Sequence, residues 1–162
     1  MAIEVREPAP KEHEETGRVT AAAYREFVEG TDWEPYLARI ADVSERAERT
    51  LVLVAVEDGR IIGSVTLELD GRTNPDDEPP PGHEAHIRML GVHPDARGRG
   101  AAKALMAACE SRAKDAGRTR ITLNTTMRME QARQMYGSLG YVRGQDEVFP
   151  DGFVLLSYFK DL

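Results

Sequence analysis

The stretch Leu90-Gly91-Val92-His93-Pro94-Asp95-Ala96-Arg97-Gly98-Arg99-Gly100-Ala101-Ala102-Lys103-Ala104-Leu105 is the most informative part of the chain. It runs from an apolar strand end, through a turn rich in glycine and arginine, into an alanine-rich helix start. Glycine allows a tight bend and a close approach of the backbone to a ligand. The free amides and the dipole at a helix N-terminus favour an anion. The stretch therefore predicts a site for a phosphate-bearing ligand.

This turn does not match the commoner phosphate-binding motifs. It lacks the G-x-x-x-x-G-K-[ST] pattern of nucleoside triphosphate sites. Lys103 stands where a dinucleotide-binding fingerprint has its third glycine. The pattern that the turn does fit is R-x-x-G-x-A, formed by Arg97, Gly100 and Ala102.

The segments on both sides of the turn predict an α+β fold, with a mixed sheet and helices on both faces. Hydrophobic periodicity indicates helices over about 11–29, after Asp32, over about 100–116 and over 130–139. Asp58-Gly59 is a hairpin signal between two strands, and residues 70–82 form a loop. The crossing from the strand at 84–92 through a helix to the strand at 120–124 implies parallel neighbours. The other predicted strands are 3–6, 51–56, 60–67, 141–142 and 153–158.

Composition narrows the classes of protein that fit. The chain has 162 residues, 41% of them hydrophobic, which suits one domain over 1–162. A formal net charge of -7 argues against non-specific nucleic-acid binding. No apolar run approaches the roughly 20 residues that span a bilayer, and the N-terminus lacks a signal peptide pattern, so we expect a cytoplasmic protein. The single cysteine, Cys109, excludes an internal disulfide and a cysteine-rich zinc site, and no metal site is expected. The place of Cys109 on an apolar helix stripe predicts a small buried side chain.

Residues 84–142 resemble the GCN5-related N-acetyltransferase (GNAT) superfamily. Its motif Q/R-x-x-G-x-G/A matches Arg97 to Ala102, with Pro94 between the strand and the arginine. Downstream, the segment from Ala132 to Tyr141 matches the family pattern A-x-x-x-Y-x-x-x-G-aromatic. The order of elements extends the resemblance to nearly the whole chain. It implies a single GNAT-like domain whose mixed, mostly antiparallel sheet is splayed at its centre.

The resemblance also implies acetyl-CoA as the cofactor. Amides from Gly98 to Ala102 would hold the pyrophosphate, Arg97 and Arg99 would add charge, and the splayed strand would accept the pantetheine arm as an extra strand. The Leu90 amide would donate to the thioester carbonyl, and Gly91, where the family usually has alanine, suits a bulge. The alternative for the two arginines is a solvated turn or an RNA contact. The residues so implied are Leu90, Gly91, Val92, Arg97, Gly98, Arg99, Gly100, Ala101 and Ala102.

One position departs from the family pattern. Many members carry an asparagine that contacts the cofactor three residues before the motif alanine, and here Met129 stands at that place. Asn124, at the end of the preceding strand, is the candidate substitute, and a water molecule is the other.

Tyr136 occupies the family's tyrosine position and is the candidate acid for the departing thiolate. A phenol with a pKa of about 10 stays protonated at neutral pH and can donate to a thiolate, whose thiol has a pKa of about 8.5. The alternative is a core tyrosine on an amphipathic helix.

The candidate bases lie on the strand that precedes the turn, where the family often has a glutamate or histidine. His86 lies four residues before Leu90 and has an ordinary pKa of about 6.5, which suits proton transfer; Glu84 is the second candidate. The alternative is that both are polar strand residues and that bulk water carries the proton. Strand parity predicts one face with Glu84, His86, Arg88, Leu90 and Val92, and the other with His83, Ala85, Ile87, Met89 and Gly91.

The function expected from this resemblance is acetyl-CoA-dependent N-acetyl transfer to a primary amine of a small molecule or peptide, by direct attack on the thioester. Two alternatives stay open: a catalytically weak acyl-CoA-binding or regulatory module on the same fold, and a nucleotide-binding protein. Helices within 11–47 and the loop 70–82 would form the acceptor wall, with Trp33 and Tyr36 packing either the acceptor or the core. Homodimers are common in the family, often through the C-terminal strands.

Overall fold

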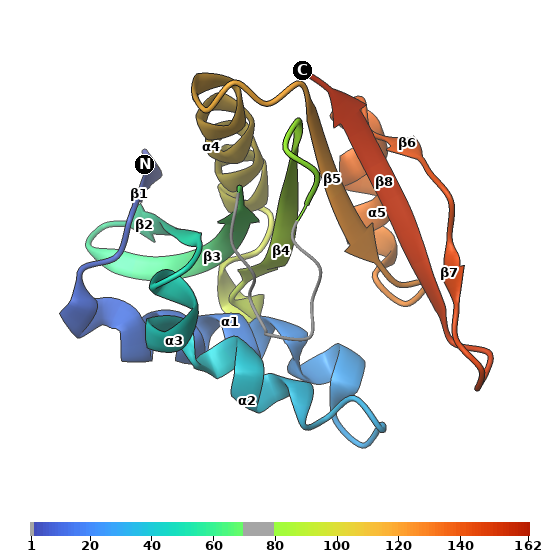
Figure 1. Cartoon of the computed structure of the whole chain (residues 1–162). Coiled ribbons are helices and arrows are strands. Elements are labelled where there is room, and N and C mark those ends of the chain that lie inside the picture. The colour runs from blue at the N-terminus through green and yellow to red at the C-terminus, as the bar shows by residue number, and fades with distance from the viewer. Residues whose placement is uncertain (1, 70–79) are drawn as a thin grey trace.

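The computed structural model describes residues 2–69 and 80–162, and these residues form a helix-covered, eight-stranded sheet (Figure 1). Among these strands only β4 and β5 pair in parallel, as the strand-helix-strand crossing predicts, and the other pairs are antiparallel. The order along the sheet is β1 (Glu4–Arg6), β2 (Leu51–Glu57), β3 (Arg60–Glu68), β4 (Glu84–Val92), β5 (Arg120–Thr125), β8 (Val154–Asp161) and β6 (Val142–Arg143), with β7 (Glu147–Val148) also paired to β8.

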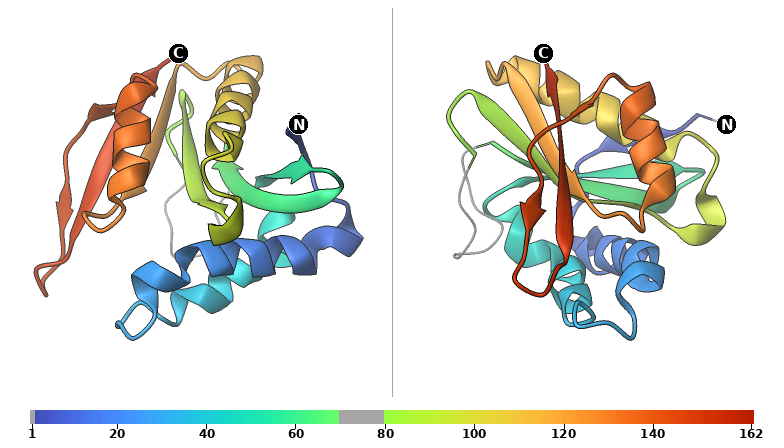
Figure 2. Two further views of the ribbon diagram at one scale, coloured as in Figure 1. Left: turned by 180° about the vertical axis from the view of Figure 1, so that it is seen from behind. Right: turned by 90° about the vertical axis from the view of Figure 1, so that its right-hand side faces the viewer.

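Helices cover both faces of the sheet, which confirms the predicted α+β class (Figure 2). One face carries α1 (His13–Val28), α2 (Tyr36–Ala41) and α3 (Val43–Ala47); Val19 of α1 packs there against Val54, Val56 and Ile61. The other face carries α4 (Ala101–Asp115) and α5 (Glu130–Ser138). Two short 3-10 helices also occur, Pro10–Glu12 before α1 and Pro94–Ala96 before α4.

The main core lies between the sheet and α4. Leu105, Met106 and Cys109 of α4 are fully buried against side chains such as Leu67 and Ile121. Burial raises the pKa of the Cys109 thiol to about 12, so the thiol stays protonated and inert. The prediction of a small buried side chain at this position is therefore confirmed. Among the described residues, none of the helices is long and apolar enough to cross a membrane.

The helix predicted after Asp32 is interrupted, and a buried arginine explains the break. Arg46, 2% exposed, donates from Nη1 to the Arg39 carbonyl at 2.7 Å and from Nη2 to the Ile40 carbonyl at 2.8 Å. These carbonyls would otherwise accept from amides four residues on in a continuous helix. Asp42 instead caps α3 by accepting from the Glu45 amide at 3.3 Å. Arg46 Nε also donates to Thr66 Oγ1 at 3.1 Å, which fixes α3 to β3.

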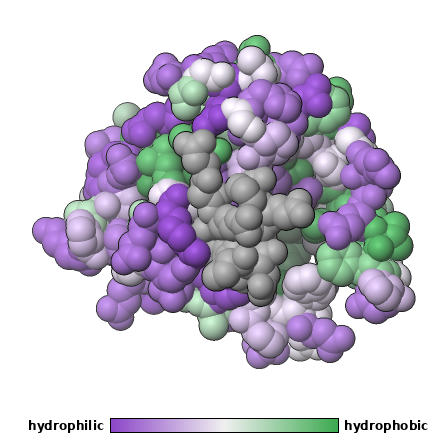
Figure 3. Space-filling view, viewed as in Figure 1, coloured by the Kyte–Doolittle hydropathy of each residue, from purple (hydrophilic) through white to green (hydrophobic). Residues whose placement is uncertain are grey.

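The C-terminal region contains more strand than the sequence predicts. β8 extends to Asp161, and the two-residue strand β7 is too short to produce a periodic signal. Trp33 packs against Phe149 and Phe153, with ring centroids 6.1 and 5.1 Å apart. Figure 3 shows a mostly hydrophilic face with a hydrophobic patch over β7, where Val148 is exposed. Positions 70–79 of the predicted loop lie outside the described residues.

The sheet parts between β4 and β5. Their pairing runs from Glu84 with Arg120 to Ile87 with Leu123, and among the described residues no pair follows. β5 stays paired to β8 as far as Thr125. The backbone of β4 beyond Ile87 therefore faces a gap on its β5 side, as the family resemblance implies.

A bulge in β4 reverses the predicted facing of its last residues. Ser64 pairs with Gly91 and Thr66 with Arg88, so three steps on β4 oppose two on β3, and Met89 has a φ of 54°. Beyond the bulge, Leu90 and Val92 pack on the α4 side of the sheet together with Ile87. The predicted parity, which put Leu90 and Val92 on the face of His86, is therefore wrong beyond Arg88. The φ of Gly91 is not positive, so the bulge is centred on Met89 rather than on the glycine.

Candidate functional site

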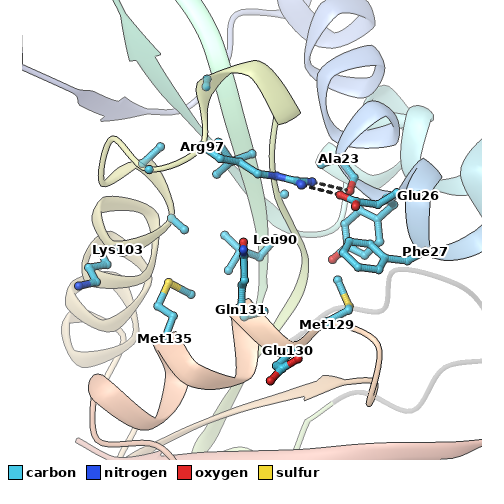
Figure 4. A pocket seen from close by; sticks show the side chains of 18 of the residues that line it. Ala23, Glu26, Phe27, Leu90, Arg97, Lys103, Met129, Glu130, Gln131 and Met135 are labelled. Carbon is cyan, nitrogen blue, oxygen red and sulfur yellow. Dashed lines mark hydrogen bonds and ion pairs between the residues drawn. The ribbon is translucent and has the colours of Figure 1, made fainter.

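A cavity of about 660 Å³ opens where β4 and β5 part (Figure 4). Four parts of the chain form its walls: the second half of α1, the end of β4, the segment from Ala96 to Lys103, and the segment from Arg128 to Tyr136. The predicted residues Leu90, Gly91, Val92, Arg97, Gly98, Gly100, Ala101, Ala102 and Tyr136 all line this cavity.

The turn before α4 has a backbone geometry that suits an anion. Gly98 and Gly100 have φ values of 80° and 90°, a region that L side chains rarely adopt. A Cβ at either position would meet no atom within 4 Å, so conformation rather than crowding requires the glycines. The first bond of α4 runs from the Ala104 amide to the Gly100 carbonyl at 3.0 Å, which leaves the amides of the first turn without helical acceptors. These donors fit a phosphate group.

The cationic side chains near the cradle differ in whether they line the cavity. Arg97 Nη1 lies 2.5 Å from Glu26 Oε1, and its Nη2 donates to the Ala23 carbonyl at 3.2 Å (Figure 4). Lys103 also lines the cavity. Arg99 instead turns to β2, where its Nη1 lies 2.6 Å from Glu57 Oε1, outside the lining residues. Of the two arginines predicted to add charge, the structure thus brings only Arg97 to the cavity.

The β5–α5 loop supplies lining residues that sequence reasoning missed. Arg128 borders the cavity and donates to the Phe27 carbonyl at 2.8 Å. Gln131, in the first turn of α5, lines the cavity, and its side chain points away from the helix axis toward the side of Leu90 (Figure 4). Asn124, predicted to replace the missing asparagine, is exposed and does not line the cavity. The only sequence signal for Gln131 was its place directly before the motif residue Ala132.

Tyr136 lines this cavity with a largely buried side chain. The residue is 5% exposed and packs against Tyr141 and Tyr158, with centroids 6.1 and 5.9 Å away. Burial, and secondarily Tyr158, raise its pKa above the ordinary value. Within the described part of the chain its hydroxyl makes no hydrogen bond, so this group is available to a ligand.

The two predicted bases lie away from the cavity. His86 Nδ1 is 2.6 Å from Thr122 Oγ1, and Glu84 Oε2 is 3.3 Å from His83 Nε2. Neither lines the cavity. At about 3.3 Å per strand residue, His86 lies roughly 13 Å and Glu84 roughly 20 Å along β4 from Leu90.

Comparisons with known proteins agree with this geometry. A family model described as "Acetyltransferase (GNAT) family" matches residues 16–141. A GCN5-related N-acetyltransferase from Rhodopseudomonas palustris is 23% identical, with a TM-score of 0.76, over 100% of this chain and 99% of that one. Ribosomal-protein-alanine N-acetyltransferase from Brucella melitensis is 19% identical, with a TM-score of 0.73, over 98% and 99%. PaiA N-acetyltransferase from Thermoplasma acidophilum, solved in complex with coenzyme A, is 18% identical, with a TM-score of 0.72, over 97% and 98%.

Proposed function

The chain belongs to the GNAT acetyltransferase family, and we propose that it is an acetyl-CoA-dependent N-acetyltransferase that acts on a primary amine of a small molecule or a peptide. One observation carries the proposal. The glycine cradle, the end of β4 beyond its last pair with β5, and Tyr136 line a single cavity.

The residues around the cavity fit coenzyme A, the ligand present in the PaiA structure. Backbone amides from Gly98 to Lys103 would hold the diphosphate, and Arg97 and Arg128 would add positive charge nearby. The free edge of β4 offers its main-chain groups to an extended amide-bearing arm. Gln131 can serve that arm in place of the absent asparagine. When bound, acetyl-CoA supplies an acetyl group activated as a thioester.

The Leu90 amide is the proposed donor to the carbonyl oxygen, which becomes negative as the amine attacks. The Leu90 side chain packs against the core on the α4 side, so the residue contributes through its backbone. Loss of one such donor typically costs about 3 kcal/mol of transition-state stabilisation in other enzymes.

Tyr136 is the proposed donor to the sulfur that leaves. Because burial raises its pKa, the hydroxyl keeps its proton at neutral pH and can donate a hydrogen bond to the thiolate as charge develops there.

Water is the proposed first acceptor of the proton that the amine loses. His86 and Glu84 do not line the cavity, so each is proposed to act through a water chain. Of the two, His86 is nearer to Leu90 and remains the first candidate for the end of that chain.

A panel of amines incubated with acetyl-CoA tests the proposed function. We expect one amine to gain a single acetyl group by mass spectrometry, together with release of free thiol. Stabilisation by acetyl-CoA without transfer to any amine would favour the alternative of a regulatory acyl-CoA-binding module. Greater thermal stabilisation by ATP or NAD than by acetyl-CoA would refute both. Gly100→Asp, which places a carboxylate at the cradle, is expected to abolish cofactor binding.

A further inference from the structure

A second tyrosine, Tyr24 of α1, also lines the cavity. Its position depends on the glycine at 91. A Cβ added to Gly91 would come to 2.8 Å from the Ala23 Cβ and 3.4 Å from Tyr24 Cε2. The bare backbone at Gly91 therefore lets α1 lie directly on β4, and this contact holds the Tyr24 ring beside the last residues of the strand.

The two tyrosines approach the parted strands from opposite faces of the sheet. Tyr24 packs with Ala21, Ile40 and Met89 on the face of α1 and α2. Tyr136 belongs to the core cluster on the face of α4 and α5. Since both line one cavity, the cavity has a tyrosine from each of the two faces. The cradle for the phosphates and Tyr136 lie on the same face, which leaves the α1 face to the acceptor.

The Tyr24 hydroxyl suits a neutral hydrogen-bonding role. Burial raises its pKa well above the ordinary value, and Tyr136 and Tyr36 add to the rise. The hydroxyl therefore stays neutral at working pH and does not serve as a base. No hydrogen bond of this hydroxyl occurs among residues 2–69 and 80–162.

We propose that Tyr24 binds the acceptor: its phenol oxygen accepts a hydrogen bond from an N–H of the neutral amine and holds the nitrogen lone pair toward the acetyl carbon. No proton passes to Tyr24. The inference rests on the proposed function, because it presupposes an amine acceptor. It gives the two phenols separate tasks, Tyr24 with the incoming nitrogen and Tyr136 with the outgoing sulfur.

Steady-state kinetics of Tyr24→Phe, with an amine that the wild-type enzyme acetylates, tests the assignment. We expect the KM for the amine to rise about tenfold, the scale of one hydrogen bond, while the Kd for coenzyme A by calorimetry stays unchanged. Tyr136→Phe should show the converse, a fall in kcat with the amine KM preserved. Tyr141→Phe is the matched control, because its hydroxyl bonds Glu110 Oε2 at 3.1 Å outside the cavity lining; it should match the wild type in both constants.

Gly91→Ala provides a second variant that keeps the phenol. The added methyl group must push α1 away from β4, so the amine KM should rise here as well. An unchanged amine KM in Tyr24→Phe, or an equal rise in Tyr141→Phe, would overturn the role of Tyr24 and leave the proposed function intact. Failure of the wild-type protein to acetylate any amine would overturn the proposed function itself, and the role of Tyr24 with it.

Discussion

Arg97 and Glu26, two residues that line the cavity, form an ion pair, with Arg97 Nη1 2.5 Å from Glu26 Oε1. The pair joins the turn before α4 to α1. Both side chains are substantially exposed, so water and salt screen the pair. The arginine that the motif places at the phosphates is thus partly neutralised by a carboxylate from another element.

Removal of the Glu26 charge should tighten cofactor binding. In Glu26→Gln, Arg97 is released toward the phosphates and a negative charge leaves the cavity wall, so we expect the Kd for coenzyme A to fall about threefold at low salt. The gain should shrink at high ionic strength. Calorimetry measures both. Glu29→Gln, an exposed carboxylate just after α1 that does not line the cavity, is the control; an equal gain there would point to net charge alone.

The two arginines of the motif should differ in their effect on binding. Arg97→Ala removes a lining cation and should weaken coenzyme A binding about fivefold, the scale of one exposed ion pair. Arg99→Ala should change the Kd by less than about twofold, because Arg99 pairs with Glu57 on β2. Equal losses in the two variants would show that the cofactor draws Arg99 away from Glu57.

Tyr136→Phe should separate turnover from affinity. The variant keeps the ring packed against Tyr141 and Tyr158 and loses only the hydroxyl. We expect kcat to fall about 100-fold, the lower range for loss of a positioned proton donor, with the coenzyme A Kd unchanged. Rapid-quench kinetics with a saturating amine measures the fall in turnover. Weaker binding with normal turnover of the bound complex would contradict the assigned role.

An ion pair between β3 and β4 should contribute to stability. Glu68 is fully buried, and its Oε1 accepts from Arg88 Nε at 2.6 Å. Glu68→Gln removes one partner and should lower the free energy of unfolding by about 3 kcal/mol, measured by urea denaturation. Glu4→Gln, whose carboxylate is 69% exposed, should cost less than about 0.5 kcal/mol. Similar small losses of unfolding free energy in the two variants would mean that the Glu68 carboxylate contributes little to stability.

The N-terminal turn should add an acid-sensitive element of stability. Glu12 accepts from Arg6 at 2.8 and 3.0 Å and from the Ala9 amide at 2.8 Å; the Arg6 hydrogen bonds lead in lowering the pKa of Glu12 from 4.5 to about 2. A lowered native pKa stabilises the fold above the unfolded value and loses this effect as pH falls from about 4.5 toward 2. The difference in melting temperature between the wild type and Glu12→Gln should therefore narrow from pH 6 to pH 3. A difference in melting temperature that stays constant from pH 6 to pH 3 would contradict this role of Glu12.

Local signals account for what could be predicted from the sequence. The glycines at 98 and 100 mark a backbone conformation that few other residues adopt, so the tight turn before α4 could be predicted from the sequence. Hydrophobic periodicity likewise located most helices and strands. The partner of each arginine could not be predicted, because Glu26 and Glu57 lie on elements far away in the chain. Nor could the break after α2, which depends on the buried Arg46.

The β4 bulge beside the cavity is formed by a methionine, and nothing in the sequence indicates that this residue adopts a positive φ. Met89 is neither glycine nor asparagine, yet it holds the left-handed backbone at the bulge of β4. Its burial with Ala21 and Ile40 is the tertiary contact available to offset that strain. The same reasoning explains why Tyr24 was missed: nothing near position 24 in the sequence shows that α1 lies against Gly91.

The bulge at Met89 also decides which side chains of β4 reach the core. If the strand kept its length and lost the bulge, β4 would regain regular alternation, and Leu90 and Val92 would rotate out of the core while position 91 turned into it. Deletion of Met89 would instead leave Leu90 and Val92 on the α4 side, because it removes the extra residue together with the bulge. Homologues that lack the bulge should therefore be one residue shorter between Arg88 and Leu90.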